Sequence, residues 1–171
     1  MTRTPPLLPE ETLMRVLRMA RINGLGMLVV AGFFSVLSAM AGDYVGTMAG
    51  LIVAGGGALE VHGGTMVAHQ DSRGMNWLVS SELVALVGIL AYCAVRLVHV
   101  QIPPVPDDLK ATLALDAQQL GMTVEQLLVR TYRIGFEIIA VLSVVYQGGI
   151  ALYYARRRRA VQRALDQIAS D

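Results

Sequence analysis

The chain has few charged residues and a single cysteine. Of its 171 residues 16% are charged, whereas about 25% is usual for a soluble domain. Cys93 is alone, which excludes disulfides within the chain and CxxC metal sites. Long low-complexity tails and Ser/Gly-rich linkers are also missing, which favours one domain over residues 1–171.

The motifs of common enzyme and nucleotide sites are missing as well. The sequence contains no GxSxG, HExxH, Walker-type GxxxxGK[ST] or CxxC motif. The glycines at 55–57 and 63–64 lie inside an expected spanning helix and are therefore not a phosphate loop. We expect no enzyme activity, no cofactor and no bound metal.

What the chain does contain is apolar sequence. Hydrophobic residues make up 54% of it, and four apolar segments reach the roughly 20 residues that a bilayer-spanning helix needs. We predict an all-α, integral membrane four-helix bundle with spans at about 22–41, 44–69, 75–100 and 134–155. The run 22–41 ends in an A-x-A pattern, as signal peptides do, but the long segment before it disfavours cleavage.

Basic residues predict the orientation in the membrane. The N-terminus, the 69–74 turn and the C-terminus together hold ten arginines, against four basic residues in and around the 100–133 connection. The positive-inside rule then places both termini in the cytoplasm. We expect an integral protein of the bacterial inner (plasma) membrane. One basic run is interpreted as a topology signal and a contact for anionic lipid headgroups, not for nucleic acid: Arg156, Arg157, Arg158 and Arg159.

The connection 101–133 is the largest piece predicted to lie outside the membrane. Its prolines end the third span, and Asp107 can cap a helix that Gly121 stops. Thr123 and Gln126 form a capping-box pattern that opens a second helix. We predict an extracytoplasmic helical hairpin that caps the bundle or lies on the lipid surface.

The second span is rich in glycine, and the small residues share one side of the helix. At 3.6 residues per turn, one face carries Gly46, Gly50, Val53, Gly57, Glu60 and Gly64. Small residues at this spacing let helix backbones approach closely in lipid, so this is predicted to be a packing face. Gly55 and His62 lie on the other side, where we expect contact with another copy of the chain in a homo-oligomer.

Two acidic residues are expected to meet inside the bundle. Asp71 lies at the centre of the turn that joins the second and third spans. Glu60 lies eleven residues before Asp71, and Glu82 lies eleven residues after it. Both carboxylates should therefore have the same depth, with Gln147 nearby. Two carboxylates in low dielectric cannot both stay ionised unaided, so a proton or a cation is expected between them. Near the outer boundary, Arg96 and Glu137 are predicted to form a structural ion pair.

These features favour a small homo-oligomeric ion or proton channel or transport component, with Glu60, Glu82 and Gln147 as its ion- or proton-binding groups. The main alternative is a non-catalytic assembly or scaffold subunit, whose buried acids serve helix association only. A haem- or metal-binding redox protein is a weaker alternative. It would need His62 to share a metal with the acids, and residues two apart on a helix do not face each other.

Overall fold

The computed structural model describes residues 9–100, 102 and 105–169. Within these ranges the chain forms five helices: α1 (Pro9–Met40), α2 (Tyr44–Ala68), α3 (Gly74–Val98), α4 (Asp107–Gln119) and α5 (Val124–Ile168). Four of them, α1, α2, α3 and α5, are long and apolar enough to cross a membrane. The predicted all-helical class and the four apolar segments are thereby confirmed.

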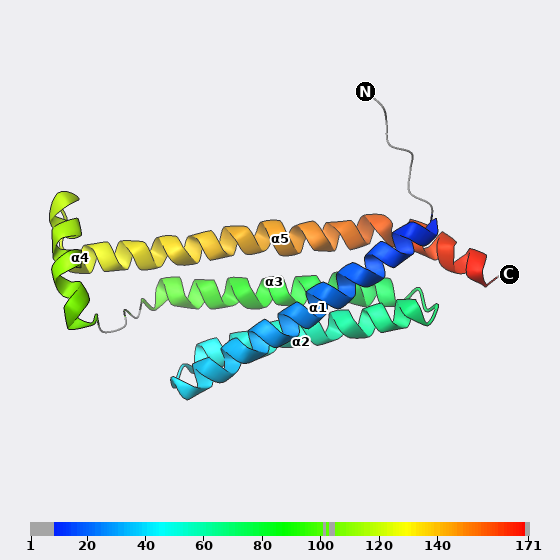
Figure 1. The fold of residues 1–171 in the computed structure, drawn as a ribbon, viewed down its shortest axis with the longest axis horizontal. Coiled ribbons are helices and arrows are strands. Elements are labelled where there is room, and N and C mark those ends of the chain that lie inside the picture. Colours follow the sequence, from blue (N-terminus) through cyan, green and yellow to red (C-terminus); the bar gives the residue numbers. More distant parts are fainter. Residues whose placement is uncertain (1–8, 101, 103–104, 170–171) are drawn as a thin grey trace, which may run out of the picture.

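The helices form an elongated bundle (Figure 1). α2 and α3 make an antiparallel hairpin, α5 runs along α3, and α1 crosses this group obliquely. The start of α1 and the end of α5 meet at one end of the bundle, here called the terminal end. At the opposite end α4 lies across the start of α5.

Two helices extend well beyond their predicted spans. α1 begins at Pro9, ahead of the predicted start at residue 22, and α5 is one continuous helix of 45 residues. The second helix predicted for the 101–133 hairpin is therefore the first part of α5. The capping box of Thr123 and Gln126 does form. No proline follows Pro106 to end the helix, so it continues through the apolar segment.

Glycine contacts hold α2 between its neighbours. A Cβ on Gly57 would lie 2.6 Å from the backbone oxygen of Gly24 in α1. On the other side of α2, a Cβ on Gly63 would lie 2.9 Å from the backbone oxygen of Gly74 in α3. Glycine at these positions lets the backbones approach as closely as they do. The predicted packing face is confirmed towards α1, and α2 is also covered by α3.

The bundle buries small and polar residues along the spans and exposes large apolar ones. Val29, Val30 and Phe33 of α1 are more than 60% exposed, as are Val141 and Leu142 of α5. Such broad apolar surface is unfavourable in water and suits contact with lipid. A cluster of larger buried apolar side chains lies mainly at the terminal end, where α1 meets α5, and includes Leu13, Val16, Ala20, Val161, Ala164 and Leu165.

A buried carboxylate pair as the candidate functional site

The central feature of the interior is a pair of carboxyl groups joined by one amide. Glu60 of α2 and Glu82 of α3 are both 0% exposed. The side-chain nitrogen of Asn23, from α1, donates to Glu60 Oε2 at 2.7 Å and to Glu82 Oε1 at 2.7 Å. The structure therefore brings together the two acids that counting from Asp71 placed at one depth.

Two tyrosines of α5 complete this network. The Tyr154 hydroxyl donates to Glu60 Oε1 at 2.6 Å, and the Tyr146 hydroxyl donates to Asn23 Oδ1 at 2.9 Å. Asn23 thus uses both amide hydrogens on the acids and its oxygen on a tyrosine, which fixes its orientation. We call these five residues the carboxylate cluster: Asn23, Glu60, Glu82, Tyr146 and Tyr154.

Within the part of the chain that the structure describes, neither acid of the cluster has a basic side chain beside it that could neutralise its negative charge. Among the described residues, no Lys, Arg or His lies within ion-pair distance of Glu60 or Glu82. Both acids accept from the same Asn23 amide, and Glu82 Oε2 is buried without a hydrogen-bond partner. Two carboxylates held this close in an apolar interior without a cation favour binding one proton between them. The geometry therefore fits a single shared proton, with Glu82 Oε2 as the position left for it.

Gln147, expected near the same layer, is buried but bonded elsewhere. Its side chain is 5% exposed, and its Nε2 atom contacts the sulfur of Met27 at 3.5 Å. Its Oε1 atom is buried without a hydrogen-bond partner. The structure thus places Gln147 in the interior without a direct bond to either acid.

A groove opens beside the cluster, between α1 and α5. Its volume is about 680 Å³, and side chains of α1, α2, α3 and α5 line it. Most of the lining residues are apolar, and the polar ones include Asn23, Ser143 and Tyr146. We call this the lateral groove. The carboxylate cluster is therefore adjacent to a cavity, with Asn23 between that cavity and the acids.

Three members of the cluster were missed by reasoning from the sequence. Asn23 is the only side-chain amide in the apolar run 22–41, and a polar group within a span normally requires a partner. Tyr154 lies seven residues after Gln147 and so shares its helix face. From these two features of the sequence, Asn23 and Tyr154 could have been predicted to lie in the interior with polar partners. Tyr146 sits beside Gln147 and is 56% exposed, so its position on the helix gave no comparable signal.

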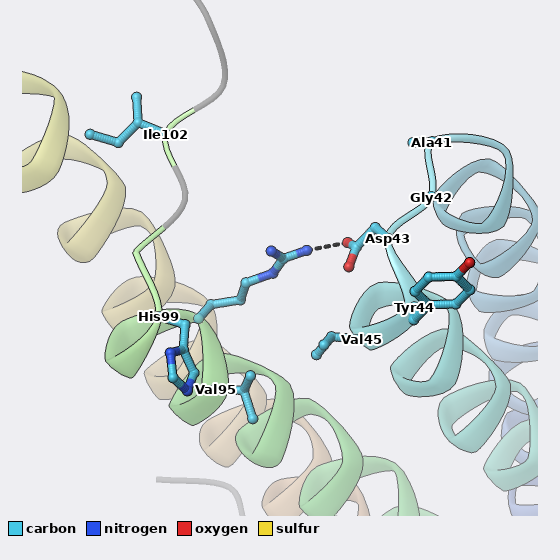
Figure 2. Close-up of a pocket in the computed structure, with 9 residues that line it drawn as sticks. Ala41, Gly42, Asp43, Tyr44, Val45, Val95, His99 and Ile102 are labelled. Carbon is cyan, nitrogen blue, oxygen red and sulfur yellow. Dashed lines mark hydrogen bonds and ion pairs between the residues drawn. The ribbon is translucent and has the colours of Figure 1, made fainter.

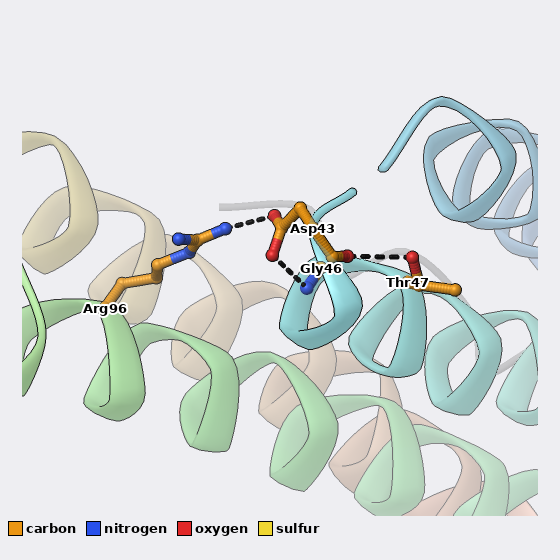
Figure 3. A network of polar contacts seen from close by, with 4 residues as sticks. All are labelled: Asp43, Gly46, Thr47 and Arg96. Carbon is orange, nitrogen blue, oxygen red and sulfur yellow. Dashed lines mark hydrogen bonds and ion pairs between the residues drawn. The ribbon is translucent and has the colours of Figure 1, made fainter. Parts of the chain in front are cut away.

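Arg96 forms an ion pair different from the predicted one. Its guanidinium bonds Asp43 at the start of α2 (Figures 2 and 3). Glu137 is instead exposed on α5. Asp43 also caps α2 by accepting from the Gly46 backbone at 3.0 Å. The prediction paired groups by depth alone, whereas the rotation of α3 directs Arg96 towards α2. His99 and Tyr44 border the adjoining pocket of about 510 Å³ (Figure 2).

The remaining predicted residues lie on the surface of the chain. Gly55 is exposed, and nothing lies within 4 Å of a Cβ built on it. His62 is exposed and packs edge-on against Trp77, with 5.7 Å between ring centroids. It therefore does not join the acids in the way that a shared metal would require. Within the described residues, no group of three or more His, Cys, Asp or Glu side chains could hold a metal ion.

Comparison with protein-family models, curated proteins and solved structures finds no match.

Proposed function

We propose that the protein is a membrane transport component that binds and releases a proton at Glu60 and Glu82. The observation that supports this most directly is a pair of fully buried carboxyl groups with no cation in ion-pair distance among the described residues. Ionisable groups inside a membrane segment are costly and commonly mark ion or proton pathways.

A proton suits this site better than a small metal cation. A hard cation such as Ca²⁺ takes six to eight oxygen ligands. In the cluster, both Glu60 oxygens and the Asn23 oxygen already accept hydrogen bonds from neighbouring side chains. Glu82 Oε2 is the oxygen left for a proton. Losing that proton would leave two adjacent carboxylates in an apolar interior, so the protonation state should be linked to helix packing.

The membrane arrangement belongs to the same proposal. Both termini would lie in the cytoplasm, with α4 outside the inner membrane of a bacterium, because the arginines gather at the terminal end. Arg156, Arg158 and Arg159 are exposed there, and Arg157 lies over the Tyr153 ring. All four would contact anionic headgroups. A homo-oligomer would form through the exposed side of α2 that carries Gly55 and His62.

A scaffold subunit is the second candidate, and one observation favours it. The hydrogen bonds of the cluster link α1, α2, α3 and α5, so the acids also connect all four long helices. In a purely structural role the proton on the pair would never exchange during function.

Proton flux into liposomes separates these candidates. The reconstituted protein should conduct protons down an imposed pH gradient, reported by a pH-sensitive dye inside the vesicles. Glu60→Gln and Glu82→Gln should abolish this flux, whereas the matched Glu125→Gln, at an exposed position at the start of α5, should leave it unchanged. If the unaltered protein shows no flux, and the two glutamine variants lose the assembled oligomer, the scaffold is the correct function.

A further inference from the structure

The lateral groove combines an apolar wall with nearby negative charge. Ile22, Val30 and Val53 are among the apolar residues that line it, and Asn23 provides a polar point on the wall next to the acids. A hydrated inorganic ion would lose its water in such a groove without enough polar groups to replace it. A ligand with a large apolar surface is only weakly hydrated, so it would not lose this hydration energy on entering the groove.

Unsatisfied polar atoms near the groove are acceptors, which match a positive ligand. Glu82 Oε2 and Gln147 Oε1 are buried without a hydrogen-bond partner. Gln147 contacts Met27, which itself lines the groove. An anion would be repelled by the acids behind Asn23, whereas a cation would gain from the low dielectric around them.

Aromatic rings add a second source of attraction for a cation. Phe34 lines the groove and packs edge to face against Tyr92, whose ring already has the Arg96 guanidinium 5.2 Å from its centroid. Tyr146 lines the same groove and is bonded to Asn23. A cation whose charge is spread or shielded by organic groups binds well against such rings.

We propose that the lateral groove binds a lipophilic organic cation that enters from the bilayer, and that this cation replaces the proton of the Glu60–Glu82 pair. The inference rests on the proposed function and names its substrate class. When the cation binds, the proton on Glu82 leaves to water, so the net charge in the interior is unchanged. Cation and proton therefore compete for one negative charge, and each is released when the other binds.

The titratable groups that contact the acids, together with the acids themselves, come from three helices. Within the described residues these are the acids themselves, on α2 and α3, and Tyr154 on α5. Tyr146 is linked to them through Asn23, the contribution of α1. The tyrosine hydroxyls act as donors to the acids and to Asn23. The exchange is therefore assigned to the carboxyl pair.

Binding of tetraphenylphosphonium to the purified, detergent-solubilised full chain tests the proposal. Isothermal titration calorimetry should show saturable binding that weakens as the pH is lowered, with release of about one proton per cation bound. Glu82→Gln should weaken binding at least tenfold. Tetraphenylborate, which has nearly the same shape and the opposite charge, should not bind saturably. Equal binding of both ions, or unchanged binding to Glu82→Gln, would mean simple partition into apolar surface and would overturn the proposal.

A pair of glycine variants tests whether the groove is the site. Gly26 lines the groove, and both it and Gly32 on the same helix have no atom within 4 Å of a Cβ. Gly26→Phe should therefore weaken tetraphenylphosphonium binding at least tenfold, while Gly32→Phe should not. In Gly26→Cys, the cation should protect the new thiol from an apolar maleimide, and Cys93 is buried. Absence of protection would place the cation elsewhere.

Proton uptake by the same preparations distinguishes a wrong substrate class from a wrong function. If the carboxyl pair exchanges a proton but tetraphenylphosphonium does not bind, only the substrate class is wrong. If neither occurs in the unaltered protein, the proposed function fails as well.

Discussion

The hydroxyl of Tyr154 lies 2.6 Å from Glu60 Oε1, and both side chains are 0% exposed. Glu60 and Tyr154 are 94 residues apart in the chain, so this bond connects α5 to α2 across the bundle. Because the other Glu60 oxygen is held by Asn23, the carboxyl group has a donor on each side.

Replacing Tyr154 by Phe removes one of these donors and keeps the ring. We expect Tyr154→Phe to lower the free energy of unfolding by about 1–2 kcal/mol, since a bond to a charged acceptor is worth somewhat more than the average bond between membrane helices. Unfolding in a titration with SDS measures this. Tyr153→Phe is the matched control and should change the free energy by less than about 0.5 kcal/mol. Equal losses in both variants would contradict the importance of the Tyr154–Glu60 bond.

Asn23 should be more sensitive, because its amide serves both acids at once. Asn23→Leu preserves the approximate size but leaves Glu60 and Glu82 facing each other without the shared donor. We expect a loss of about 2–4 kcal/mol, and a larger loss at high pH, where the shared proton is removed. Asn76→Leu, at an exposed position of α3, is the control. The same SDS titration at two pH values measures both effects, and a loss that does not depend on pH would contradict the shared proton.

The sequence predicted how deep each acid lies and which side of α2 it faces. Both follow from regular helix geometry: residues are counted from the turn at Asp71, and small residues mark the side where backbones touch. Glu60 and Glu82 came together for that reason. The continuous course of α5 did not follow in the same way, because a capping box at Thr123 marks where a helix starts and says nothing of where it ends.

Contacts made by α1 and α5 needed the three-dimensional structure. α1 crosses α2 obliquely, so a residue such as Asn23 meets the acids only because of the crossing angle that the glycine contacts allow. Arg96 illustrates the same limit. Its depth was known from the sequence, but its partner depended on the rotation of α3, which turned it towards Asp43.

Gly57 and Gly32 give a sharp test of the α1–α2 contact. A Cβ at Gly57 would lie 2.6 Å from the Gly24 backbone oxygen and 2.7 Å from the Leu28 nitrogen, so the helices must separate. We expect Gly57→Ala to destabilise the bundle by about 1–3 kcal/mol. Gly32→Ala, on α1, meets open space and should be neutral or slightly stabilising, because alanine favours helix. Thermal unfolding in detergent compares the two, and equal stabilities would contradict the tight contact.

Asp43 has two roles that can be separated by substitution. Asp43→Asn keeps an oxygen that can cap α2 but removes the charge that pairs with Arg96. This variant should lose less than about 1 kcal/mol, and the difference from the unaltered protein should shrink in high salt. Asp43→Ala removes the cap as well and should lose about 1 kcal/mol more. SDS titrations at low and high salt measure both. If Asp43→Asn and Asp43→Ala are equally stable, the cap contributes nothing.

The exposed side of α2 offers the test of self-association. Gly55 leaves open space on this side, into which a neighbouring chain could pack closely, and the His62 ring there lies against Trp77. If this side joins two copies, Gly55→Leu should convert the oligomer to a species of 18.4 kDa protein mass, because the added side chain holds the helices apart. Gly32→Leu places the same side chain in open space on α1 and should leave the mass unchanged. Light scattering after size exclusion, corrected for detergent, measures the protein mass. An oligomer that survives Gly55→Leu must use another surface, and one lost in Gly32→Leu but not in Gly55→Leu would assign the interface to α1.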